Sequence, residues 1–245
     1  MSDKESKSID VLGIKPVADA VSHVTQAAVD GASAFLSRIC LPAAEELGFL
    51  LQDKVRAWRA KNATAAIVNA QALYEKYQAG RDAHAHPRLV ASIVEHSGWI
   101  DDRTLQQMWG GLLASSCSRD GRDESNLIFV NLLAQLTSLQ VRVLSYACSN
   151  TGKYVTGEGL IMPQRGPYVD MAALQEISGA NDIHRIDMEL DHLRALELIM
   201  GGLRPGATHV DITPTPLALN LFVRCQGFTG SAVEFFNLKP PAPGT

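Results

Sequence analysis

The sequence lacks the short motifs by which many catalytic and metal sites are recognised. It contains no GxxxxGK followed by Ser or Thr, no HExxH and no CxxC pair. These motifs would carry a phosphate-binding loop, a zinc protease site or a thiolate metal site. No nucleophile and base stand at a recognisable spacing either. The sequence therefore predicts a protein that is not an enzyme, with no catalytic residues, no cofactor, no metal site and no evident small-molecule substrate.

An excess of basic charge is also missing. The formal net charge is −4 and the pI is about 6.0, so nothing attracts the whole chain to nucleic acid or to an anionic membrane. A content of 46% hydrophobic and 20% charged residues is typical of a globular protein. The first ten residues are polar and of mixed charge, unlike a secretory signal. Scattered cysteines without ligand spacing indicate reduced thiols, so we expect a cytoplasmic protein. They are Cys40, Cys117, Cys148 and Cys225.

Glycine is absent from residues 49–79, and proline is absent after Pro42 until residue 87. This uninterrupted stretch predicts one long helix over about 42–78. Apolar residues recur there in steps of three and four, and a polar asparagine occupies one position of the stripe. A polar residue in such a stripe can fix the register of a helical interface. We therefore expect an assembly interface at Leu51, Val55, Trp58 and Asn62.

The preceding segment, 15–41, is rich in small residues and poor in charge. His23, Gln26 and Asp30 near its centre would be costly inside a bilayer, and few basic residues are present to bind lipid headgroups. The pattern favours a helix packed against other helices. Peripheral membrane association, or a membrane-acting effector that inserts this segment, stays an alternative.

Helices are expected next at Arg88–His96 and from Asp102, a capping residue, onward. The pair Gly110-Gly111 inside the second helix predicts close approach of another backbone. His84, His86 and His96 are interpreted as loop residues because no further metal ligand accompanies them.

The C-terminal part has the order helix, turn, helix and two short strands. The two helices are Asp170–Ser178 and one capped by Asp182, and the strands are Leu198–Met200 and Val210–Ile212. This order is typical of a winged helix, and 150–167 is expected to be irregular.

The predicted fold is mainly α: an N-terminal helical bundle with one long helix, then a winged-helix-like domain with a small two-stranded β wing. The expected domains are a disordered lead-in at 1–14, a helical domain at 15–136, the winged-helix-like domain at 137–230 and a flexible proline-rich tail at 231–245.

The second helix of the predicted winged helix carries four acidic residues and two arginines. DNA binding requires several phosphate contacts, so this balance argues against nucleic acid and favours a protein partner. Residues that would meet a partner are Arg185, Glu189, His192 and Arg194.

Several stretches resemble the bacterial Abi-alpha family, which is associated with abortive infection. They are Pro42–Arg59 (PAAEELG leading into DKVRAWR), His86-Pro87, Leu105–Ala114 (LQQMWGGLLA) and Leu136–Leu144 (LTSLQVRVL). The resemblance implies a role in bacterial anti-phage defence and supplies no site residues. We therefore expect a non-enzymatic defence protein that binds a protein partner or assembles as a homo-oligomer. A DNA-binding transcriptional regulator is the other alternative.

Overall fold

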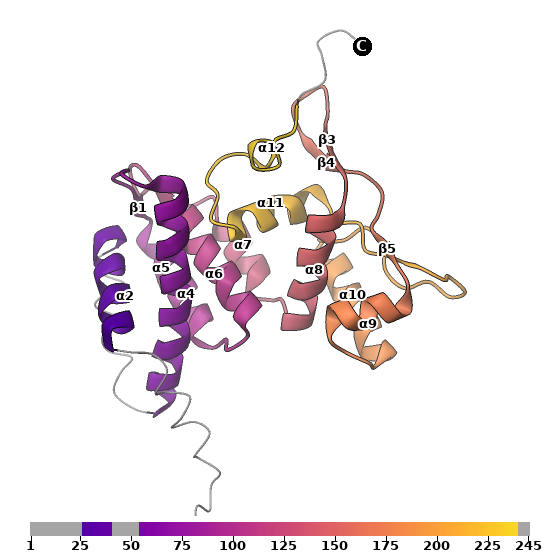
Figure 1. Cartoon of the computed structure of the whole chain (residues 1–245), viewed down its shortest axis with the longest axis horizontal. Coiled ribbons are helices and arrows are strands. Elements are labelled where there is room, and N and C mark those ends of the chain that lie inside the picture. The colour runs from indigo at the N-terminus through magenta and orange to yellow at the C-terminus, as the bar shows by residue number, and fades with distance from the viewer. Residues whose placement is uncertain (1–25, 41–53, 240–245) are drawn as a thin grey trace, which may run out of the picture.

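The computed structural model describes residues 26–40 and 54–239, which form a mainly helical molecule with small two-stranded sheets (Figure 1). Figure 1 shows α2, α4 and α5 at one end, α9 and α10 at the other, and α6, α8 and α11 between them. The N-terminal elements are α2 (Gln26–Ile39), α4 (Lys54–Gln78), β1 (His84–Ala85), α5 (Pro87–Gly98), α6 (Arg103–Ser115), β2 (Cys117–Ser118) and α7 (Leu127–Leu133). The C-terminal elements are α8 (Ser138–Asn150), β3 (Lys153–Val155), β4 (Ile161–Pro163), β5 (Tyr168–Val169), α9 (Met171–Ser178), α10 (Ile183–Ala195), β6 (Val210–Asp211), α11 (Pro216–Cys225) and α12 (Ala232–Phe235).

The expected long helix is present as α4 from Lys54, while residues 42–53 lie outside the described part of the chain. Helices α2, α5 and α6 pack around it, so burial is not confined to one stripe. Ala66 and Ala70 are buried as the spacing predicts, and Ile67 and Tyr74 are buried beside them. Small side chains on a buried helix allow its neighbours to approach closely.

Helix α2 packs against α4 through a stripe of buried residues. Ala32, Phe35, Leu36 and Ile39 are buried at steps of three and four, as an amphipathic helix requires. Within 26–40, the segment therefore lies against α4 and β1. No helix among residues 26–40 and 54–239 is both long and apolar enough to cross a membrane.

Helix α6 is held between α4 and α11, and its two glycines make this possible. A Cβ atom on Gly110 would lie 2.5 Å from the carbonyl oxygen of Ala66 in α4. One on Gly111 would collide with the carbonyl of Cys225 at the end of α11. The predicted close approach is confirmed, and it involves two helices: α4 contacts α6 at Gly110, and α11 contacts it at Gly111.

Replacing Gly111 with alanine is expected to lower the free energy of unfolding by about 2 kcal/mol, because an added methyl group must push two backbones apart. Chemical denaturation monitored by circular dichroism measures this. The matched control is Gly31→Ala in α2, where an added Cβ meets nothing within 4 Å. That variant should be as stable as the parent or slightly more so. Equal stability of the two variants would contradict the packing of α6 against α11.

The helices of the C-terminal part begin where the sequence places capping residues. Thr137 and Gln140 form a capping box at the start of α8. The side chains of Asp170 and Asp182 accept backbone hydrogen bonds at the starts of α9 and α10. Gly179 ends α9 in a left-handed conformation with φ of 67°. Such signals are local, so the sequence predicts them well.

The strand pairing differs from the expectation in two places. The stretch 150–167, expected to be irregular, contains the antiparallel hairpin β3–β4, in which Val155 pairs with Ile161. Val210 and Asp211 pair with Val169 and Tyr168 of β5, rather than with the strand that precedes them in sequence. Strand β5 is only two residues long and follows a proline, so no alternating pattern marks it.

The predicted strand Leu198–Met200 pairs with residues just after β6. The Met200 amide donates to the Thr213 carbonyl at 2.8 Å, and the Thr215 amide donates to the Leu198 carbonyl at 3.0 Å. Ile199 forms a bridge with Pro214. The chain from Val210 to Thr215 therefore contacts β5 at its start and Leu198–Met200 at its end.

Helix α12 lies within the segment expected to be a flexible tail. Ser231 and Glu234 form a capping box, and Phe235 and Phe236 each lie 6.4 Å, between ring centroids, from Phe222 of α11. This aromatic cluster anchors the chain after α11. Residues 240–245 lie outside the described part.

Candidate functional site

Of the four residues expected to form an assembly interface, the structure describes the side chains of two, Trp58 and Asn62. Leu51 lies outside the described residues, and Val55 is described only as part of the α4 backbone. Trp58 is half-buried, and its ring centroid lies 6.4 Å from that of Trp99. Asn62 is buried, with 2% of its surface exposed.

Trp99 is exposed and organises the charges near Trp58. The guanidinium carbon of Arg59 lies 4.3 Å from the Trp99 ring centroid, and its Nη2 lies 2.6 Å from Oε2 of Glu95. The indole Nε1 of Trp99 donates to the other Glu95 oxygen at 3.1 Å. The hydrogen bond from Trp99, followed by the bond and charge of Arg59, lowers the pKa of Glu95 despite partial burial. The charge of Arg59 is thus neutralised locally.

Asn62 links three helices of its own chain. Its Nδ2 donates to the carbonyl of Gly98 at 3.2 Å, at the end of α5. Its Oδ1 lies 3.5 Å from Nε2 of Gln106 in α6. The polar residue in the stripe therefore fixes the register of contacts within the chain. Its partners follow it by 36 and 44 residues, so the sequence stripe does not indicate them.

The variant Asn62→Ala is expected to lose about 1–3 kcal/mol of unfolding free energy, because the Gly98 carbonyl is left without its donor. The matched control is Asn69→Ala, which removes the same amide group from the same helix where it makes no hydrogen bond to a described residue. Denaturation at two protein concentrations distinguishes the two roles of Asn62. A loss that grows on dilution would instead indicate an interface between copies.

The four residues predicted to meet a partner on α10 face in two directions. Glu189 is 7% exposed and accepts a hydrogen bond from Thr137 Oγ1 at 2.8 Å. His192 Nδ1 lies 2.8 Å from Gln140 Nε2. Both side chains therefore join α10 to the start of α8. Arg185 and Arg194 lie on the exposed side, where each pairs with an acid of α10, Glu189 and Asp191 respectively.

Apolar residues also lie on the exposed side of α10. Met188 is 65% exposed and Ile183 is exposed at the first turn. With both arginines paired, this helix face carries little free positive charge. It offers apolar contact area next to balanced charges. Met188 lies off the stripe that the buried Ile186, Leu190 and Leu193 form at steps of four and three, so helical spacing agrees with its exposure.

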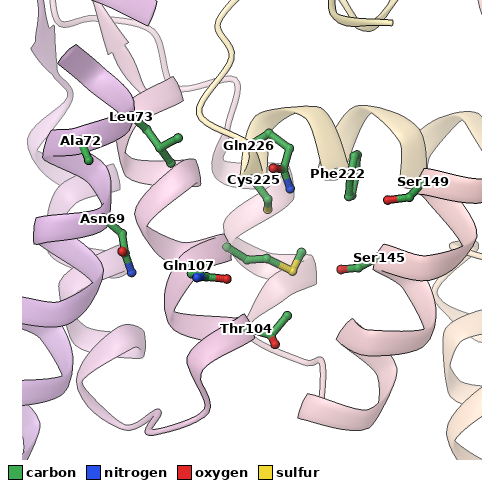
Figure 2. A pocket seen from close by; sticks show the side chains of 11 residues that line it. Asn69, Ala72, Leu73, Thr104, Gln107, Ser145, Ser149, Phe222, Cys225 and Gln226 are labelled. Carbon is green, nitrogen blue, oxygen red and sulfur yellow. The ribbon is translucent and has the colours of Figure 1, made fainter. Parts of the chain in front are cut away.

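A cleft of about 560 Å³ lies between α4, α6, α8 and α11 (Figure 2). Figure 2 shows Ser145 and Ser149 of α8 facing Gln107 of α6 across it, with Phe222, Cys225 and Gln226 above. The lining is Asn69, Ala72, Leu73, Thr104, Gln107, Met108, Ser145, Ser149, Phe222, Cys225 and Gln226. No Asp, Glu, Lys, Arg or His is among these residues. The sequence did not indicate this cleft, because its residues come from four separate helices.

The surroundings of three thiols, those of Cys117, Cys148 and Cys225, make them unreactive. Burial raises the pKa of Cys117 and of Cys148 to about 12 each, and it raises the pKa of Cys225 at the cleft as well. A thiol that stays protonated at neutral pH is a poor nucleophile. The buried Cys225 therefore contributes apolar surface to the cleft.

The three histidines near α5 lie in different elements and have different contacts. His84 lies in β1, His86 accepts a hydrogen bond from the Arg88 amide at the start of α5, and His96 stacks on Trp109 at 5.5 Å between ring centroids. No cluster of three His, Cys, Asp or Glu side chains suited to a metal occurs in the described ranges.

The fold is that of a mainly helical protein with small two-stranded sheets. The family model described as Abortive infection alpha matches residues 62–206, more than half of the chain, so the chain belongs to this family. The match includes three of the four stretches that resemble the family, from His86-Pro87 to Leu136–Leu144, and leaves out Pro42–Arg59. Comparisons with curated proteins and with solved structures found no match.

Proposed function

We propose that the protein acts in the bacterial cytoplasm as a non-enzymatic component of abortive infection defence, through binding of a protein partner. Membership of the Abortive infection alpha family supports the defence role. The partner-binding region in this proposal is a winged helix at 137–230, and its contact surface is the exposed side of α10.

The order and pairing of the elements support the winged helix. After α8 and the β3–β4 hairpin come β5, α9, α10, the extended Leu198–Met200 and β6. Pairing of β5 with β6, and of Leu198–Met200 with the residues after β6, gives a small sheet beside the two helices. In a winged helix the helix after the turn is the contact helix, which here is α10.

The exposed Met188 is the observation that carries the choice of a protein partner. A thioether side chain fills irregular apolar contacts and is common at protein-binding surfaces. The nearby arginines are already paired with acids, so they offer little to a phosphate backbone. Exposed apolar residues beside balanced charges suit a protein surface better than a polyanion.

The variant Met188→Asp is expected to abolish protection of bacteria against phage, because a carboxylate at the centre of an apolar contact is desolvated without a partner. Plaque counts on cells that produce the parent or the variant measure this. The control is Ile128→Asp on α7, where a side chain of similar exposure, 60%, is replaced in the same way. Ile128→Asp should protect as well as the parent. The proposal fails if Met188→Asp also protects as well as the parent.

A second candidate function, binding to DNA, has one observation in its favour. A cleft of about 490 Å³ beside the loop 201–209 is lined by Arg165, Arg204 and His209. Neither arginine forms an ion pair with a described residue. The acid at this cleft, Asp211, already accepts hydrogen bonds from Thr213. This is the part of the winged-helix region where positive charge is available for phosphates.

The double variant Arg165→Glu/Arg204→Glu tests this candidate in a gel-shift titration with duplex DNA at low salt. If DNA is a ligand, the parent shifts it at micromolar concentration and the double variant weakens binding at least about tenfold, since two phosphate contacts become repulsive. Arg185→Glu/Arg194→Glu serves as the matched control on α10. Equal affinity of the parent and both double variants would exclude the wing cleft as a DNA site.

A further inference from the structure

The cleft of Figure 2 is lined by several uncharged polar side chains. Three carboxamides, Asn69, Gln107 and Gln226, and three hydroxyls, Thr104, Ser145 and Ser149, are present together. None of these six side chains hydrogen-bonds to another described residue. Elsewhere, amides such as Asn62, Gln78 and Gln140 do bond within the chain. The cleft therefore concentrates hydrogen-bonding groups that the fold does not use.

The chemistry of the lining specifies a neutral ligand. Each carboxamide offers both a donor and an acceptor, and each hydroxyl can act as either. With no charged side chain in the lining, a carboxylate or phosphate would lose water there without gaining a counter-charge. The matching ligand carries no charge and presents donors and acceptors side by side.

The apolar part of the lining favours a flat ligand. Met108 and Phe222 are buried, yet they line the cleft from two different helices. A thioether and a phenyl ring both contact planar aromatic systems favourably. Asn and Gln side chains pair with two adjacent positions on the edge of a base, which a single donor cannot do. A volume of about 560 Å³ lies within the usual range for small-molecule sites.

We propose that this cleft is a binding site for a neutral nucleobase or nucleoside, held by the carboxamides of Asn69, Gln107 and Gln226 against Met108 and Phe222. The site differs from the exposed side of α10 in position and in chemistry. Because α4 and α6 form one wall and α8 and α11 the others, a bound base contacts both halves of the molecule.

The test is isothermal titration of the full chain with adenosine, guanosine, cytidine and uridine, each in turn. At least one nucleoside is expected to bind saturably, with a Kd of about 1 mM or tighter. Adenosine 5′-monophosphate is the charged comparison and should bind no tighter than adenosine. Glucose is the neutral comparison without a planar face and should not bind.

Variants assign the binding to the cleft. Gln107→Ala removes an exposed amide that makes no hydrogen bond within the described chain, so the fold should be unaffected while the Kd rises about tenfold. Ser145→Trp fills the cleft and should abolish binding. Asn131→Ala on α7 removes an exposed amide outside the cleft and should bind as the parent does.

Three results would overturn the proposal. In the first, none of the four nucleosides binds. In the second, binding occurs but is unchanged in both Gln107→Ala and Ser145→Trp. In the third, glucose or the monophosphate binds more tightly than every nucleoside. Phage protection by Met188→Asp is a separate measurement, so the outcome for α10 and that for the cleft are independent.

Discussion

The contact of the α6 backbone with two other helices is the constraint on which the rest of the structure depends. Side-chain-free positions at Gly110 and Gly111 allow α4 on one side and α11 on the other to approach α6 at backbone distance. Such contacts leave no room for adjustment, because close-packed interiors do not deform to admit an extra methyl group. Helix α11 also packs on α8, so the position of α6 fixes the two halves of the molecule relative to each other.

This constraint creates the cleft as well. Helix α8 contacts α6 and α11, and a space remains between these three helices and α4. The six polar side chains of that space make no hydrogen bond to another described residue. The glycines and the buried apolar residues hold the fold, while the carboxamides of the cleft are not used by it. The sequence indicated no small-molecule ligand, because those amides lie far apart along the chain.

How far the sequence predicts the structure depends on the distance between interacting residues. The caps at Asp102, Thr137 and Asp182 act within one helical turn and are local signals in the sequence, and Asp170, expected as the first helical residue, caps α9 in the same way. The glycine pair predicted close approach without naming the partners. Pairing of β5 with β6 joins residues more than forty positions apart, and no pattern within a two-residue strand reveals it. In the sequence, Asn62 is recognisable as a polar residue within an apolar stripe. Only the fold shows that its hydrogen-bond partners belong to the same chain.

The distance in sequence between α6 and α11 has a consequence for synthesis on the ribosome. Gly111 packs against the backbone of Cys225, which the ribosome adds more than a hundred residues later. Until α11 leaves the exit tunnel, one face of α6 has no cover, and the fourth wall of the cleft does not exist. The N-terminal helices thus form early but reach their final packing only after α11 has been made. A prematurely terminated product that lacks α11 would expose this face, which makes such fragments natural substrates for chaperones and proteases.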